Sequence, residues 1–291
     1  MQPSELTPSN LRRAIARRVA RAHRGIDDAS LLALVSGSVV EDIADSKSDI
    51  DMSVVFAHPP DEALLAAACV RAGGTPWFWR QGSLTEDGLV VAFRIDGIEV
   101  QIGYSIHATL NRDLDTLLVE HKPDTPIHKL AEGILKAEPL EGDAQLERLK
   151  TRLRIFPDEL ADAMVRHFLA APLSWRGISQ LVDRDAALWC RDLQVDACYR
   201  LCGVLAGLNR IYFTRFQVKR LRRLAAKFVN APTDLAQRVE RLLDAPPREA
   251  FALLFELEGE VLERVERAMP HIDLEAVRTR RAAFDPSPLA P

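Results

Sequence analysis

The sequence lacks the features that mark a membrane-bound or secreted protein. No apolar run approaches the roughly 20 residues that a membrane-spanning helix needs. Residues 1–25 carry several arginines but not the apolar core of a secretory signal. The apolar residues of this segment recur at helical spacing, which predicts an amphipathic helix with a solvated arginine face. We therefore expect a cytoplasmic protein that does not engage a membrane.

The cysteines and histidines lack the spacing of a metal or redox site, and the basic residues do not outnumber the acidic ones. The seven histidines show no HExxH pattern, so we predict no zinc site. With 38 basic against 42 acidic residues the net charge is −4. We do not expect nucleic acid as a partner, because a protein that binds nucleic acid needs a concentrated basic surface. No CxxC pair is present, and we expect free, buried thiols in a reducing compartment. The cysteines are Cys69, Cys190, Cys198 and Cys202.

What remains is the composition of a folded, globular protein. Its 291 residues, 47% hydrophobic and 27% charged, suffice for one large or two ordinary domains. Strand signals are confined to the first part, where residues 31–36 and 49–56 are typical of buried strands. Residues 89–95 and 98–104 flank Asp96-Gly97, a dipeptide that favours a two-residue hairpin turn.

From about residue 107 the strand signals stop and helical periodicity takes over. Helices are expected at residues 126–137, 143–153, 157–170, 174–208, 215–229, 233–244 and 247–268. The change of pattern predicts an α+β architecture with two domains. A small mixed-sheet domain occupies residues 1–125, and an all-helical bundle domain occupies residues 126–291.

Two acids stand in a strand-like segment that is otherwise apolar, Asp49 and Asp51. Residues i and i+2 of a strand point to the same face, so both carboxylates project together while Ile50 and Met52 face the core. Adjacent carboxylates repel unless a cation neutralises them, and Mg²⁺ prefers carboxylate, phosphate and water oxygens. The D-x-D spacing alone also suits solvated acids on an edge strand. In its context it predicts a site for Mg²⁺ and a nucleoside triphosphate.

Small residues that are able to bind a phosphate group precede these acids. Gly37-Ser38 follows one strand and precedes an expected helix start. A glycine lets the backbone approach a phosphate closely, and the serine hydroxyl and the first free amides of a helix can donate to it. Ser48, immediately before Asp49, is a second hydroxyl donor. We therefore predict a phosphate clamp beside the metal site.

A third acid, Glu99, lies near the start of the second hairpin strand. Ile98, Val100 and Ile102 define one face of that strand, while Glu99, Gln101 and Gly103 define the other. On the open face Glu99 can complete the metal site as a third ligand, or can act as general base for an attacking hydroxyl. The sequence leaves both roles open.

In order along the chain, these residues resemble the DNA polymerase β-like nucleotidyltransferase superfamily. The similarity spans roughly residues 30–105 and consists of Gly37-Ser38, a ten-residue gap, Asp49-Ile50-Asp51 and a later acid between apolar residues. A sheet domain followed by a helical bundle looks most like its antibiotic-modifying branch, the aminoglycoside and lincosamide nucleotidyltransferases. The resemblance implies Ser38 and Ser48 on the triphosphate, Asp49 and Asp51 on Mg²⁺, and Glu99 as third ligand or base. The loop between the serines departs from the pattern, because it holds three acids and no further glycine.

The helical half carries a second similarity, in residues 203–221. In relatives of those enzymes an Asn, a Tyr and a Lys of such a stretch approach the nucleotide, which nominates Asn209, Tyr212 and Lys219 as nucleotide-binding residues. A lysine supplied by the second domain would neutralise triphosphate charge. The alternative for Lys219 is a solvated charge on a basic helix face.

These observations combine into one hypothesis. The chain is expected to transfer a nucleoside monophosphate, with ATP as the favoured donor, to a hydroxyl of a small antibiotic-like molecule between the domains. It is expected to use two Mg²⁺ ions and to release pyrophosphate. Two alternatives remain: a protein, nucleic-acid or nucleotide acceptor, or a nucleotide-binding regulatory module that has lost catalysis. The sequence does not indicate an oligomeric state.

Overall fold

The fold is known from a computed structural model that describes residues 7–26, 31–170, 181–182 and 184–282. The chain forms two compact units. The first consists of residues 1–116 and 130–155, and the second of residues 117–129 and 156–291. The first unit therefore includes residues 130–155, which follow the boundary that the sequence placed at residue 125.

A six-stranded mixed sheet forms the centre of the first unit, and the expected α+β class is confirmed. Its strands are β1 (Leu32–Ser36), β2 (Ile50–Phe56), β3 (Trp79–Ser83), β4 (Gly88–Ile95), β5 (Ile98–Ile106) and β6 (Glu138–Glu141). They lie in the order β3-β4-β5-β2-β1-β6. The β2–β5 pair is parallel and the other neighbouring pairs are antiparallel. The two strands that bear the predicted acids are thus direct neighbours.

The turn between β4 and β5 is the predicted hairpin. Asp96 and Gly97 have φ values of +52° and +80°, as a type I′ turn requires, and Ile95 pairs with Ile98 across it. The edge strand β6 was not predicted from the sequence. It contains Pro139, which a sheet tolerates at an edge, where no neighbouring strand requires its missing N–H group.

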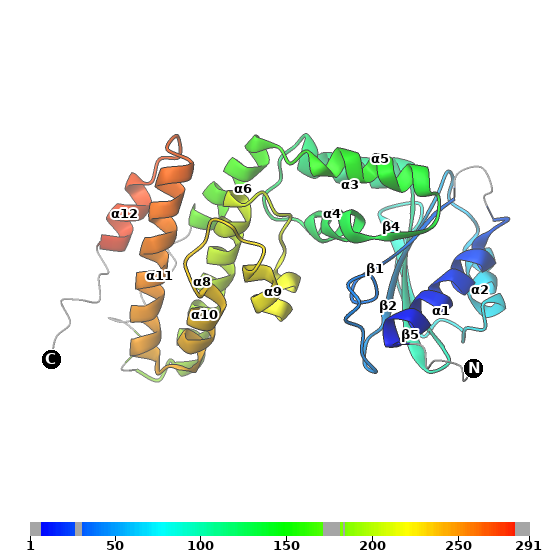
Figure 1. The fold of residues 1–291 in the computed structure, drawn as a ribbon, viewed down its shortest axis with the longest axis horizontal. Coiled ribbons are helices and arrows are strands. Elements are labelled where there is room, and N and C mark those ends of the chain that lie inside the picture. The colour runs from blue at the N-terminus through cyan, green and yellow to red at the C-terminus, as the bar shows by residue number, and fades with distance from the viewer. Residues whose placement is uncertain (1–6, 27–30, 171–180, 183, 283–291) are drawn as a thin grey trace. The chain divides into compact units, whose positions relative to one another are not determined.

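Two helices, α1 (Pro8–His23) and α2 (Glu62–Arg71), lie side by side over one face of this sheet (Figure 1). Side chains of both helices and of β1, β2, β4 and β5 form a single buried core. Ile50, Val100 and Ile102 point into that core and are fully buried. The alternate residues of β2 and β5 consequently face the opposite side of the sheet.

The chain continues through α3 (His107–Leu118), α4 (Ile127–Lys136) and α5 (Asp143–Arg154). The helices described in the second unit are α6 (Asp158–Ala170), α8 (Ala187–Leu208), α9 (Leu221–Ala225), α10 (Leu235–Asp244), α11 (Pro247–Ala268) and α12 (Glu275–Ala282). Helix α8 packs against α6 and α11. Gly203 of α8 lies against the ring of Phe168 of α6, and this ring occupies the space that a Cβ of residue 203 would take. Much of the predicted helix 174–208 before residue 187 lies outside the described residues.

The predicted helix 215–229 was wrong in type. Residues Arg215–Arg220 form a 3₁₀ helix, η1, and only the five residues of α9 follow as α-helix. The Gln217 side chain donates to the Tyr212 carbonyl at 2.7 Å and accepts from the Thr214 amide. Such local side-chain contacts to the backbone compete with α-helical hydrogen bonding.

All four cysteines are buried and free, as predicted. Burial raises the pKa of the Cys198 and Cys202 thiols to about 12, so both stay protonated at neutral pH. Within the described ranges, no helix is long and apolar enough to cross a bilayer.

Candidate active site

Asp49 and Asp51 lie on either side of Ile50, the first residue of β2, and both are half-buried. Asp51 stands between Ser36 of β1 and Gln101 of β5 in the strand register. Asp49 directly precedes the strand, whose pairing with β5 begins at Ile50. Because Ile50 points into the core, its two acidic neighbours face the other side of the sheet, as the alternation predicted.

Gln101 connects this pair to the third predicted acid. Its amide Nε2 donates to Glu99 Oε1 at 2.9 Å and reaches Asp49 Oδ2 at 3.5 Å. Asp49 and Glu99 therefore lie on the same side of the sheet, with one amide between them. A neutral donor between two carboxylates reduces their mutual repulsion.

Gly37 lies against the carboxylate of Asp51. A Cβ at residue 37 would collide with Asp51 Oδ2, and Gly37 has a φ of +69°, which favours glycine. Steric space and backbone conformation thus both call for glycine at the end of β1. The role of Gly37 at a phosphate stays a prediction, because the group that lies against it in the structure is the carboxylate of Asp51.

The segment after Gly37-Ser38 is not a helix, so that prediction was wrong. Residues 37–42 form consecutive turns, in which the Asp42 amide donates to Val39 O and the Ile43 amide donates to Ser38 O. In an α-helix each of these amides would bond to the carbonyl four residues back, whereas here Asp42 bonds three residues back and Ile43 five. No helix N-terminus is available between β1 and β2 to bind phosphate.

The three acids of this loop each have a separate partner. Glu41 pairs with Lys136 of α4, and Asp42 pairs with Arg13 of α1 at 2.6 Å. Asp45 accepts from the Lys47 amide at 2.9 Å and from the Ser48 hydroxyl at 3.0 Å, and these hydrogen bonds lower its pKa. The acids that depart from the family pattern hold the loop in place.

The two predicted phosphate-binding serines differ in their surroundings. The Ser48 hydroxyl is engaged with Asp45, and it also accepts from the Asp45 amide at 3.0 Å. Ser38 is half-buried at the start of the turn and contributes its carbonyl to the turn hydrogen bond. Of the two hydroxyls, that of Ser38 can meet a phosphate without breaking a contact of the loop.

The donor set of Asp49, Asp51 and Glu99 fits Mg²⁺ chemically, since all its members are carboxylates. Among the residues that the structure describes, no group of three or more His, Cys, Asp or Glu side chains is close enough together to hold a metal ion. Gln101 donates to two of the three carboxylates. The three acids therefore share one face without forming a three-ligand cluster.

The nominated residues of the second unit have different environments. The side-chain Nδ2 of Asn209 donates to Leu205 O at 2.7 Å and to Asn230 O at 3.0 Å. Its Oδ1 accepts from the backbone N–H of Asn230 at 2.7 Å. Tyr212 is 3% exposed, and its ring packs 4.8 Å from that of Phe156. Lys219 is exposed on η1. Asn209 and Tyr212 thus make structural contacts on either side of the turn that leads to η1.

The second unit contains a pocket that the sequence did not predict. Its lining residues are Asp124, His167, Phe168, Tyr199, Arg200, Phe213 and Arg215. Asp196 pairs with both arginines, and the Arg215 guanidinium lies 4.9 Å from the centre of the Tyr199 ring. None of the three nominated nucleotide-binding residues lines this pocket.

Sequence reasoning missed two residues that build the carboxylate site. Gln101 was placed on the correct face but given no role. Arg12 was assigned to a solvated face of α1, yet it is 3% exposed and its guanidinium donates to the Ser48 carbonyl. Its partner is 36 residues away, so helical spacing within α1 carries no signal for the contact.

Comparison with known proteins adds a similarity of limited extent. A solved structure of a nucleotidyltransferase-like protein from Exiguobacterium sibiricum 255-15 aligns with 92% of this chain and 85% of its own, at 15% identity and a TM-score of 0.32. No protein-family model matches the chain, and no curated protein matches it. Likeness at this level assigns no activity, so the function is argued from the residues.

Proposed function

We propose that the chain is a metal-dependent nucleotidyltransferase whose active site is formed by β1, β2 and β5. The observation that carries the proposal is the shared face of Asp49, Asp51 and Glu99, with Gln101 between two of them and Gly37 against the third. Carboxylates on one face of neighbouring strands suit the binding of a cation or the transfer of a proton. Solvated acids on an edge strand do not fit, because β2 and β5 are inner strands.

Each residue has a role that follows from its place. Asp49 and Asp51 would hold Mg²⁺, which when bound supplies positive charge to the triphosphate. Ser38 would donate its hydroxyl to a phosphate oxygen. Lys219, exposed on η1, is proposed as a cationic contact of the triphosphate. Asn209 and Tyr212 would support the backbone that leads to it.

Glu99 is best suited to the role of general base. Its Oε1 accepts from Gln101 and is thereby oriented on β5, and the acids do not form a three-ligand group. Glu99 would take the proton of the acceptor hydroxyl as the hydroxyl oxygen bonds to the α-phosphorus. The bond between the α-phosphorus and its bridging oxygen breaks, and pyrophosphate leaves. ATP is the favoured donor.

The acceptor class is proposed from the family resemblance and the charge of the chain. A small antibiotic-like molecule with a free hydroxyl is the first candidate, and the acidic balance of 42 against 38 charges disfavours a polynucleotide. Transfer of this kind would confer antibiotic resistance on a cell that contains the protein.

The proposal is tested by incubating the full chain with each labelled nucleoside triphosphate and Mg²⁺ against a library of antibiotics and metabolites. An acceptor that gains the mass of a nucleoside monophosphate, with wild-type protein and not with Asp51→Asn, supports it. A protein or nucleotide acceptor would change the substrate class alone. Triphosphate binding without turnover across the panel would favour a regulatory module instead.

A further inference from the structure

Arg12 is a buried cation whose hydrogen bonds serve the backbone. It lies in α1 and is 3% exposed. Its Nε and Nη2 both donate to the Ser48 carbonyl, at 2.9 and 2.7 Å, and its Nη1 donates to the Pro8 carbonyl at 3.1 Å. No carboxylate of the described chain lies within ion-pair distance of it. Because burying a charge is costly, a guanidinium in this position must be fixed by the carbonyls it contacts.

The carbonyl that Arg12 binds belongs to the peptide directly before Asp49. The strand register with β5 begins at Ile50, so the peptide before Asp49 lies outside the paired residues of β2. Two hydrogen bonds from one planar guanidinium restrict the rotation of the Ser48–Asp49 peptide. Rotation there would swing the Asp49 carboxylate away from Gln101, and with it the first half of the D-x-D pair.

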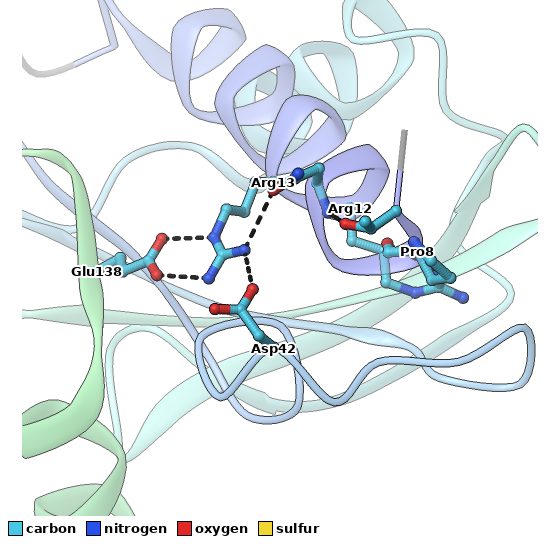
Figure 2. A network of polar contacts seen from close by, with 7 residues as sticks. Pro8, Arg12, Arg13, Asp42 and Glu138 are labelled. Carbon is cyan, nitrogen blue, oxygen red and sulfur yellow. Dashed lines mark hydrogen bonds and ion pairs between the residues drawn. The ribbon is translucent and has the colours of Figure 1, made fainter. Parts of the chain in front are cut away.

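The next residue of the helix has a different task. Arg13 makes two parallel hydrogen bonds to Glu138 of β6, both of 2.8 Å, and one to Asp42 of the loop at 2.6 Å (Figure 2). Figure 2 shows the guanidinium of Arg13 between these two acids. Arg13 thus ties the middle of the loop to the sheet, whereas Arg12 holds its last peptide. The neighbouring arginines differ in what they hold, which makes Arg13 a matched control.

We propose that Arg12 is a positioning residue of the proposed active site, which sets the affinity for a divalent cation by fixing the peptide that carries Asp49. This inference rests on the proposed function, since it assigns the cation to Asp49 and Asp51. Arg12 itself contacts neither cation nor substrate. It acts through the Ser48 carbonyl.

The test compares Arg12→Gln, Arg12→Lys and Arg13→Gln in the full chain. Mn²⁺ binding is measured by electron paramagnetic resonance, which requires no turnover. Outer residues that orient metal ligands typically change metal affinity about 10–100-fold, and we expect a loss of this size for Arg12→Gln. Arg12→Lys should fall between, because an ammonium lacks the planar fork. Arg13→Gln should bind Mn²⁺ as wild type does, although it loses more ion pairs.

Hydrogen exchange of the same variants tests the role of Arg12 separately from the presence of a cation site. The amides of residues 48–51 should exchange faster in Arg12→Gln than in Arg13→Gln. If wild-type protein binds no Mn²⁺, the proposed function fails and the inference fails with it. If wild type binds Mn²⁺ and Arg12→Gln binds it equally well, only the role of Arg12 is overturned. Should Arg12→Gln not fold, Arg12→Lys against Arg13→Gln decides between the same outcomes.

Discussion

Gly37 and Asp51 are in direct contact across the end of β1 and the start of β2. The space that a Cβ of residue 37 would take is occupied by Asp51 Oδ2, and the φ of Gly37 is +69°. The glycine therefore sets where the second acid of D-x-D can lie. This relationship joins the two halves of the motif, which one loop separates in sequence and which meet where β1 ends and β2 begins.

Replacement of Gly37 by alanine should impair both folding and the site. A residue with a Cβ in this backbone region costs roughly 1–3 kcal/mol, and the carboxylate of Asp51 must also move. We expect a lower free energy of unfolding in urea and a loss of Mn²⁺ affinity. Gly97→Ala is the matched control, since its φ of +80° is similar but nothing lies within 4 Å of its Cβ position. Equal Mn²⁺ affinity in both variants would refute the link to Asp51.

Replacement of Glu99 by glutamine should show whether Glu99 acts as a general base or as a metal ligand. General-base catalysis contributes about 10²–10⁴-fold, and we expect kcat to fall by such a factor while Mn²⁺ affinity and KM for the triphosphate stay unchanged. Glutamine keeps the size of the side chain and an oxygen for Gln101 to donate to. A strong loss of Mn²⁺ affinity in Glu99→Gln would instead make Glu99 the third ligand.

Replacement of Asn209 by alanine should act on stability. The side chain makes three hydrogen bonds to main-chain groups, and its loss leaves the Asn230 amide without its acceptor. The loss of such a part-buried hydrogen bond costs about 1 kcal/mol, which chemical unfolding would register. Triphosphate affinity, measured by calorimetry on the folded variant, should stay at the wild-type value. A selective loss of that affinity would restore Asn209 as a nucleotide-binding residue.

The local parts of the fold could be predicted from the sequence because they depend on near neighbours. Alternation along β2 and β5 placed Asp51 and Gln101 on one face, and Asp96-Gly97 specified the hairpin turn. The α+β division followed from the change of hydrophobic period near residue 107. These patterns repeat every two or four residues, so a single sequence displays them.

Contacts between distant segments could not be predicted in this way. The burial of Arg12 depends on Ser48, and the edge strand β6 depends on pairing with β1 over about a hundred residues. The loop from Gly37 to Ser48 looked like a helix start, but its acids bind Arg13 and Lys136 from other elements. Charges that appear solvated along one helix can thus be structural once the partner segment folds against them.

Stability should depend on pH through His23, which is fully buried under the sheet. Its Nδ1 donates to the Val19 carbonyl at 2.8 Å, so its Nε2 accepts from the Tyr104 hydroxyl at 2.8 Å, and Tyr104 also contacts the Cys69 thiol. Burial lowers the pKa of His23, and the charge of Arg71 adds to this effect. The folded state therefore favours the neutral ring.

Between that lowered pKa and the ordinary value near 6.5, the unfolded chain binds a proton that the folded chain does not. The free energy of unfolding should thus fall as the pH drops below about 6.5, by at most about 1.4 kcal/mol per pH unit for this histidine. His23→Gln keeps an acceptor for Tyr104 without a titrating ring. Urea unfolding at pH 5 and 7.5 should show a smaller pH dependence in the variant; an equal dependence would rule out His23 as its source.

Pyrophosphate release provides the most direct test of nucleotidyl transfer at Asp49 and Asp51. Wild-type protein, Asp49→Asn and Asp51→Asn are compared with ATP, Mg²⁺ and an acceptor found by mass shift, after far-UV circular dichroism has shown that each is folded. We expect Mg²⁺-dependent release from wild type and none above background from either variant. A double variant that releases pyrophosphate at the wild-type rate would contradict the assignment of this site.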